Sequence, residues 1–360
     1  MQIVRQALLI LLCAGLTGCA ATGPNARKQA LIEVARSDQQ WTGVAVSREG
    51  RLFVNYPLWG TMENSSVWEI LPSGAIRPYP TPNWNVWNPS LPPADHFVCV
   101  QTVYADRENQ LWILDAANPR FEGVVAGGPK LVQVDLDSNE VVRKILFDAT
   151  VAPPDSYLND VRVDTVRNYA YITDSGAGAL VVVDLTTGRA RRVLDQHSST
   201  EAENIAVTIE DEQWQLPDGS APRIHADGLA LTADGEYLYY QALTGRTLYR
   251  IDTLSLRDET LSSPVLGRKV QYVDTTGPAD GILFGPGGNL YLTAIQDNAI
   301  RHYTPAGSIE TVVEDPQLQW PDTMALGPDD FIYVTTSRIH LGFSNPGPYR
   351  LFKFKPDMLK

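Results

Sequence analysis

Cysteine, positive charge and long apolar segments are all scarce in this sequence. The 360 residues contain 3 cysteines, and 29 lysines and arginines stand against 42 aspartates and glutamates, for a net charge of −13. Proteins that grip phosphate use clustered lysine and arginine, so this balance excludes a nucleic-acid partner and disfavours a polybasic contact with anionic lipid. Cations, neutral small molecules and other proteins remain as partners.

Standard catalytic motifs are also missing. The sequence has no Gly-x-Ser-x-Gly elbow, no His-Glu-x-x-His pair, no phosphate loop and no dinucleotide fingerprint. Cys99 lies in the apolar run Phe97–Val100, which predicts a buried structural thiol rather than a nucleophile. Nucleophilic serine or cysteine catalysis therefore has no support.

The N-terminus carries an export signal. Arg5 is followed by an apolar run at 7–16 that is too short to span a bilayer, and then by a Leu-Thr-Gly-Cys motif ending at Cys19. This motif matches the bacterial lipobox and predicts a signal peptide over 1–18, lipid on Cys19 and a flexible tether over 19–28. A plain secretory signal is the alternative. The alanine after the cysteine favours the outer membrane in a host with two membranes, and the lipid would be the only membrane contact.

One pattern of two apolar strands and a turn recurs six times in the chain. The aligned apolar positions of the first strands are Val44, Val103, Val161, Leu229, Ile282 and Met324. Their spacing of 42 to 68 residues suits one four-stranded propeller blade plus loops. Helical periodicity is nowhere long enough to define an element. The sequence therefore predicts an all-β fold, a single six-bladed β-propeller over 29–360.

The two ends of this region predict how the ring closes. The last repeat stops after a third strand at 349–355, whereas 29–36 is a strand without a partner that precedes the first repeat. Pairing this N-terminal strand with the last blade closes the ring and leaves no unpaired partner there.

The repeats also predict a site at the centre. The first strand of each propeller blade lines the channel and begins at one mouth, so the residue two before each aligned position should face the channel. These residues are Thr42, Gln101, Asn159, Asp227, Asp280 and Asp322. Clustered carboxylates need a cation or a proton, and oxygen ligands favour Ca²⁺ first, with Mg²⁺ or Mn²⁺ possible. We therefore expect one divalent cation on Asn159, Asp227, Asp280 and Asp322. The alternative is that these residues only form turns that cap the strand starts.

Loops at the same mouth supply further candidate ligand-binding residues. Polar ones are Asp174, Gln241 and Gln296, and Trp59 and Trp320 are expected as aromatic walls of a small-molecule pocket. His225 precedes Asp227 and is a candidate general base, with a hydrogen-bonding loop residue as the alternative.

Several segments resemble the major royal jelly protein and yellow family over about residues 30 to 356. They are the residues 83–85, 97–101, 156–164, 170–176, 239–243 and 320–323. The resemblance implies a secreted six-bladed propeller. Insect members include small-amine binders, proteins with dopachrome conversion and nutritional proteins. The paired cysteines of the insect members are absent from this chain.

A more distant similarity is to the gluconolactonase and regucalcin propellers, which hold a divalent ion on a Glu, an Asn and an Asp. Asp227 and Asp280 match the Asn-bearing and Asp-bearing loops, and Asn159 resembles a substrate-contacting Asn, but Thr42 stands where the Glu is required. Three hypotheses follow: a membrane-anchored propeller that binds a small organic ligand at its channel mouth, a metal-dependent hydrolase of a lactone or ester, and an interaction scaffold.

Overall fold

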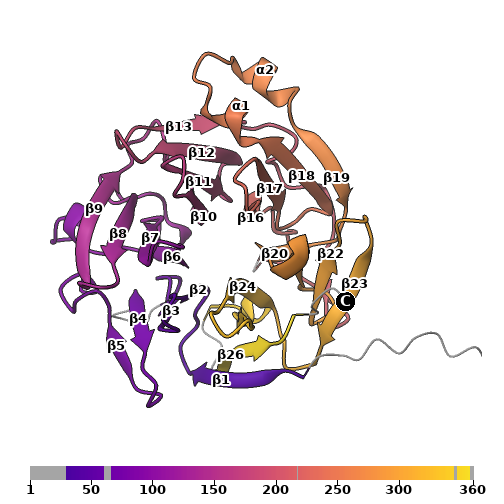
Figure 1. Cartoon of the computed structure of the whole chain (residues 1–360), viewed down its shortest axis with the longest axis horizontal. Coiled ribbons are helices and arrows are strands. Elements are labelled where there is room, and N and C mark those ends of the chain that lie inside the picture. Colours follow the sequence, from indigo (N-terminus) through magenta and orange to yellow (C-terminus); the bar gives the residue numbers. More distant parts are fainter. Residues whose placement is uncertain (1–29, 61–65, 217, 344–346, 357–360) are drawn as a thin grey trace, which may run out of the picture.

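The chain forms a ring of six four-stranded antiparallel sheets around a central channel (Figure 1). This computed structural model describes residues 30–60, 66–216, 218–343 and 347–356. In order from the channel outwards, the strands of the first three blades are β2 (Val44–Val46), β3 (Leu52–Asn55), β4 (Val67–Ile70), β5 (Ile76–Pro78); β6 (Val100–Ala105), β7 (Gln110–Asp115), β8 (Lys130–Asp135), β9 (Glu140–Leu146); and β10 (Leu158–Asp164), β11 (Tyr169–Asp174), β12 (Ala179–Asp184), β13 (Ala190–Val193). Those of the last three are β16 (Ala226–Leu231), β17 (Tyr237–Ala242), β18 (Thr247–Asp252), β19 (Gln271–Thr275); β20 (Ala279–Phe284), β21 (Leu290–Ala294), β22 (Ala299–Tyr303), β23 (Ile309–Glu314); and β24 (Pro321–Leu326), β25 (Ile332–Thr336), β26 (Tyr349–Phe354), β1 (Ile32–Ser37). The predicted six-bladed propeller is confirmed.

The remaining elements are short. They are the hairpin β14 (Thr208–Ile209) and β15 (Glu212–Gln213), the α-helices α1 (Thr253–Arg257) and α2 (Ser263–Gly267), and four 3₁₀ turns at Pro93–Asp95, Pro119–Phe121, Pro286–Gly288 and Ile339–Leu341. None of the helices in the described residues has the length and apolar character that a membrane crossing requires. Cys19 and the segments assigned to the signal peptide and tether lie outside the described residues.

The ring closes as the sequence predicts. β1 pairs antiparallel with β26, with Ile32 opposite Lys353 and Ser37 opposite Tyr349. In Figure 1 the N-terminal strand accordingly lies on the outer edge of the last blade. This pairing joins strands from opposite ends of the chain, so the six blades are held as one closed body.

The core lies between neighbouring blades. Almost every residue of β12 is buried, because both faces of its sheet are covered. Leu180 and Val182 pack towards blade 4 with Leu229 and Tyr240, whereas Val181 and the alternate residues of β12 pack towards blade 2. This packing explains why the blade strands are apolar in successive residues rather than in alternate ones.

Candidate functional site

The predicted channel residues occupy equivalent places at the start of the inner strands. Five of the six inner strands shift register against their neighbours at this point: β6, β10, β16, β20 and β24. Such bulges re-aim side chains and are frequent beside functional sites. The glycines after Asp227 and Asp280 allow the strands to approach, since a Cβ on Gly228 would lie 2.6 Å from Asp280 O and one on Gly281 would lie 2.2 Å from Asp322 O.

A chain of hydrogen bonds links four of these strands. The Tyr157 hydroxyl donates to Gln101 Oε1 at 2.9 Å, and Gln101 Nε2 lies 3.5 Å from Asn159 Oδ1. Asn159 Nδ2 then donates to Asp227 Oδ2 at 2.8 Å. Asp227 contacts Asp280, and Trp320 Nε1 donates to Asp280 Oδ2 at 2.6 Å. The repeat pattern therefore brings Gln101, Asn159, Asp227 and Asp280 into one network.

Three buried carboxyl groups at this mouth hold protons unusually tightly. Burial, together with the charges of Asp280 and Asp322, raises the pKa of Asp227 well above its ordinary value. Burial also raises the pKa of Asp280 to about 7, although the hydrogen bond from Trp320 opposes this shift. Two carboxyl groups this close cannot both ionise easily, so Asp227 and Asp280 share a proton near neutral pH.

Asp322 has the least satisfied side chain of the three. Burial, followed by the charge of Asp280, raises its pKa well above the ordinary value, and the nearby Ser337 and Thr323 hydroxyls act in the opposite direction. Thr323 Oγ1 donates to Oδ1 at 3.1 Å, whereas Oδ2 is buried and forms no hydrogen bond within the described residues. The Ser337 hydroxyl is nearby and is also without a partner there, so one further donor at Oδ2 would complete the hydrogen bonds of this carboxyl group.

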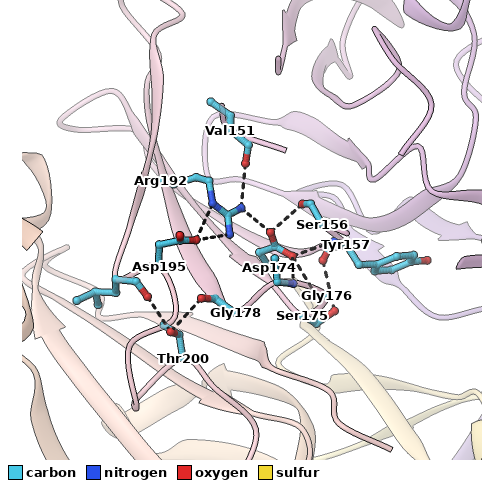
Figure 2. A network of polar contacts seen from close by, with 12 residues as sticks. Val151, Ser156, Tyr157, Asp174, Ser175, Gly176, Gly178, Arg192, Asp195 and Thr200 are labelled. Atoms are coloured by element: carbon cyan, nitrogen blue, oxygen red, sulfur yellow. Dashed lines mark hydrogen bonds and ion pairs between the residues drawn. The ribbon is translucent and has the colours of Figure 1, made fainter. Parts of the chain in front are cut away.

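Asp174 serves as a clamp beneath the mouth. Figure 2 shows its carboxylate between the guanidinium of Arg192 and the start of β10. It accepts the Ser156 hydroxyl at 2.7 Å and the Tyr157 backbone N–H at 2.8 Å. Asp115 has the same place in blade 2, where it accepts the N–H groups before β6 and binds a buried lysine. Asp174 thus positions Tyr157, and its predicted ligand contact has no geometric support.

Three other predicted residues make bonds within the fold. Thr42 Oγ1 donates to Gln101 O at 2.8 Å, and Gln241 Nε2 donates to Gly277 O at 3.1 Å. Gln296 Nε2 donates to Thr208 O at 3.1 Å and so holds the β14–β15 hairpin. These bonds give all three residues a role in positioning the loops around the mouth.

His225 is poorly suited to act as a general base. Its Nδ1 accepts the backbone N–H of Ala202 at 3.0 Å, which leaves the proton of the neutral ring on Nε2. Burial, followed by the charge of Arg223, lowers the pKa of His225. The free ring nitrogen is therefore a donor at neutral pH, in agreement with the alternative of a hydrogen-bonding loop residue.

An aromatic shelf, defined by Trp59, Phe121, Tyr157 and Phe343, borders the network. Trp59 stacks on Phe121 at 5.7 Å, and Phe121 lies 5.0 Å from Tyr157 and 5.4 Å from Phe343. Trp59 Nε1 donates to the Tyr157 hydroxyl at 2.5 Å, which connects the shelf to Gln101. Phe121 is 48% exposed and Phe343 is 40% exposed, so two large rings of this shelf face solvent.

The β14–β15 hairpin covers the opposite side of the mouth. Glu210 at its turn accepts hydrogen bonds from Gln319 at 2.8 Å and from Asn298 at 3.2 Å, and lies 3.6 Å from His340 Nε2. His340 stacks on Trp320 with 5.8 Å between ring centroids. Through these contacts the hairpin, which belongs to the connection between blades 3 and 4, is fastened to the β21–β22 turn of blade 5 and to the loops before β24 and after β25 in blade 6.

Within the described residues, no group of three or more His, Cys, Asp or Glu side chains is placed to hold a metal ion. The carboxylates of Asp227 and Asp280 face each other as a proton-sharing pair, and Thr42 occupies the place of the missing first-blade Glu. The oxygen donors suit a hard cation in kind but not in arrangement, so the predicted cation stays a prediction.

Sequence reasoning did not single out several residues of this region. They are the shelf residues Tyr157, Phe121 and Phe343, the hairpin residue Glu210, and the ion pair of Asp160 with Arg162. The charged pair in the segment Asn-Asp-Val-Arg at 159–162 was an available signal, since an inner strand surrounded by other blades rarely carries two charges.

The closed ring and the carboxylate-rich channel together define a six-bladed β-propeller with its candidate site where the inner strands begin. The family model of the major royal jelly proteins matches residues 98–356. The chain therefore belongs to the major royal jelly protein family.

Two curated relatives illustrate the breadth of this family. A Drosophila melanogaster protein named dopaminechrome tautomerase is 30% identical over 156 residues, which cover 40% of this chain and 33% of the relative. Major royal jelly protein 7 of Apis mellifera is 24% identical over 227 residues, 58% of this chain and 48% of the relative. The matches thus span between a third and a half of the length of these relatives.

Solved structures share the fold at low sequence identity. A luciferin-regenerating enzyme has a TM-score of 0.55 and 14% identity, with 91% of this chain and 95% of that chain covered. A gluconolactonase from Xanthomonas campestris has a TM-score of 0.55 and 12% identity, with coverages of 91% and 89%. These similarities show the propeller fold.

Proposed function

We propose that the protein is an exported, lipid-anchored propeller that binds a small organic ligand at the mouth where its inner strands begin. The observation that carries this proposal is the cluster of three buried carboxyl groups, Asp227, Asp280 and Asp322, in which Asp322 Oδ2 forms no hydrogen bond within the described residues. A ligand with an N–H donor or a positive charge satisfies this acceptor. The exposed rings of Phe121 and Phe343 supply flat apolar contact area at the same mouth. The anchor at Cys19 is tested by membrane fractionation of wild type against Cys19→Ala.

The binding proposal is tested by thermal unfolding with a matched pair of probes. Tyramine carries an ammonium group, and 4-ethylphenol has a similar ring without charge. We expect tyramine at a hundred times its Kd to add about 2.7 kcal/mol of stability, and 4-ethylphenol to add much less. The Asp322→Asn variant should lose the difference in stabilisation between tyramine and 4-ethylphenol. The Glu210→Ala variant should bind tyramine faster, because it frees the β14–β15 hairpin from Gln319 and Asn298.

The control is Asp95→Asn, which removes a surface carboxylate far from the network. If neither probe shifts the unfolding midpoint of wild type, or if Asp322→Asn leaves the difference intact, the proposal is wrong. Repeating the scan with chelator and then with Ca²⁺, Mg²⁺ or Mn²⁺ tests the hydrolase alternative, since that activity requires an ion that binds the folded state.

A second candidate is an isomerase that moves a proton on a small quinone-like substrate. It is supported by the Asp227–Asp280 pair, in which one carboxylate accepts and the other donates near neutral pH. The relative named dopaminechrome tautomerase adds to this support. With dopaminechrome as the probe, Asp280→Asn should abolish turnover and leave the binding of tyramine in place.

A further inference from the structure

The channel is divided by the side chain of Arg162. This residue lies on β10 in blade 3, and its Nη2 donates to Ile282 O of blade 5 at 3.1 Å, past the inner strand of blade 4. Its Nη1 binds Asp160 at 2.8 Å, and the guanidinium lies 5.3 Å from the ring of Tyr104 in blade 2. Since Arg162 is 6% exposed and bonded on several sides, it separates the carboxyl network from the rest of the channel.

A cavity of about 1120 Å³ lies on the far side of Arg162, at the mouth where the inner strands end. Arg162 lines it, whereas none of the six predicted channel residues at the other mouth does. Large apolar side chains at its lining are exposed, namely Val166 at 85%, Tyr272 at 62% and Leu326 at 41%. The volume slightly exceeds the usual range for small-molecule sites, and the apolar groups offer contact for the apolar part of a ligand.

The charged groups of this cavity favour an anion. Its aspartates, Asp106, Asp164 and Asp234, each accept hydrogen bonds from their own turns. Arg107 and Arg250 also line the cavity, and neither forms an ion pair within the described part of the chain. Arg107 Nη1 donates to Ala233 O at 3.5 Å, and Arg250 donates to Gln271 and Tyr239, so each guanidinium still keeps N–H donors for a ligand.

We propose that this cavity is a second binding site, for an amphiphilic organic anion with an apolar ring or chain and one acidic group. The acidic group lies against Arg107 and Arg250, and the apolar part lies against Val166, Tyr272 and Leu326. The site uses none of the residues Asn159, Asp227, Asp280 and Asp322 at the other mouth. Its test is therefore independent of the function proposed for that mouth.

The experiment compares two fluorescent probes that differ by one sulfonate. They are 8-anilinonaphthalene-1-sulfonate and the uncharged N-phenyl-1-naphthylamine. We expect the sulfonate to bind folded protein with one-to-one stoichiometry and at least tenfold more tightly than the neutral probe. The double variant Arg107→Gln/Arg250→Gln should abolish this preference, and Val166→Asp should weaken both probes.

The matched control is Arg189→Gln, which removes an exposed arginine on the outside of blade 3. Circular dichroism and the unfolding midpoint verify that each variant is folded. Binding of many probe molecules per chain, an equal affinity for the two probes, or a preference that survives the double variant would overturn the proposal. Asp322→Asn should leave the sulfonate titration unchanged, which separates this result from that for the other mouth.

Discussion

The Asp227→Asn variant should be more stable than wild type at pH 8, and the difference should shrink as the pH is lowered and vanish near pH 4. The reason is the raised pKa of the buried carboxyl groups: burial raises the pKa of Asp280 to about 7 and holds the pKa of Asp227 well above its ordinary value. The folded state therefore binds protons that the unfolded chain has released, and stability falls as the pH rises from about 4 through the folded pKa. Asparagine mimics the protonated form, donating to Asp280 and accepting from Asn159.

The expected gain is about 1.4 kcal/mol for each pH unit, above about pH 4, over which the folded wild type keeps a proton that the unfolded chain has released. It is measured by chemical denaturation in the presence of a chelator, which removes any cation that would hold the carboxylates together. Asp95→Asn on the surface should show no gain, because Lys144 lowers the pKa of Asp95. A wild type that is equally stable at pH 5 and pH 8 would contradict the tight protonation of this cluster.

The repeat pattern was sufficient to predict the ring and the places of the channel residues. Polar residues that precede each inner strand at one fixed position share a mouth by symmetry, so Asn159, Asp227 and Asp280 meet although their sequence spacing is irregular. Ring closure was equally predictable, because the N-terminal strand had no partner other than β26.

The roles of individual polar residues were not predictable from the same pattern. Asp174 has the residue type and position of a ligand contact, but Arg192 in another strand of its blade turns it into a clamp. Within the described residues the β14–β15 hairpin has no counterpart in the other blades, so no alignment of repeats places Glu210 beside His340. The extent of the far cavity depends on where side chains block the channel. Arg162, in the middle of the inner strand β10, blocks it by reaching Ile282 O of blade 5.

The Lys130→Met variant should lose about 3–5 kcal/mol of unfolding free energy, which is the usual effect of leaving one buried charge without its partner. Lys130 and Asp115 are both 0% exposed at the side chain, with 2.6 Å between Nζ and Oδ2. Lys130 also donates to Pro93 O and Gly128 O. The variant therefore strands a carboxylate and two carbonyls inside blade 2. Thermal unfolding should show a midpoint lower by roughly 4–7 °C.

Two further variants separate the charge from the packing. Asp115→Asn combined with Lys130→Met removes both charges and keeps one acceptor oxygen, for the N–H groups of Cys99 and Ala117, while the Val98 N–H loses its acceptor. The double variant should therefore recover part of the loss. Lys144→Met breaks an ion pair at the surface and should change stability by less than about 1 kcal/mol. If Lys130→Met alone changes the stability by less than about 1 kcal/mol, the backbone N–H donors suffice to hold the Asp115 carboxylate. Asp115 would then position the start of β6, which carries Gln101, without the Lys130 ammonium group.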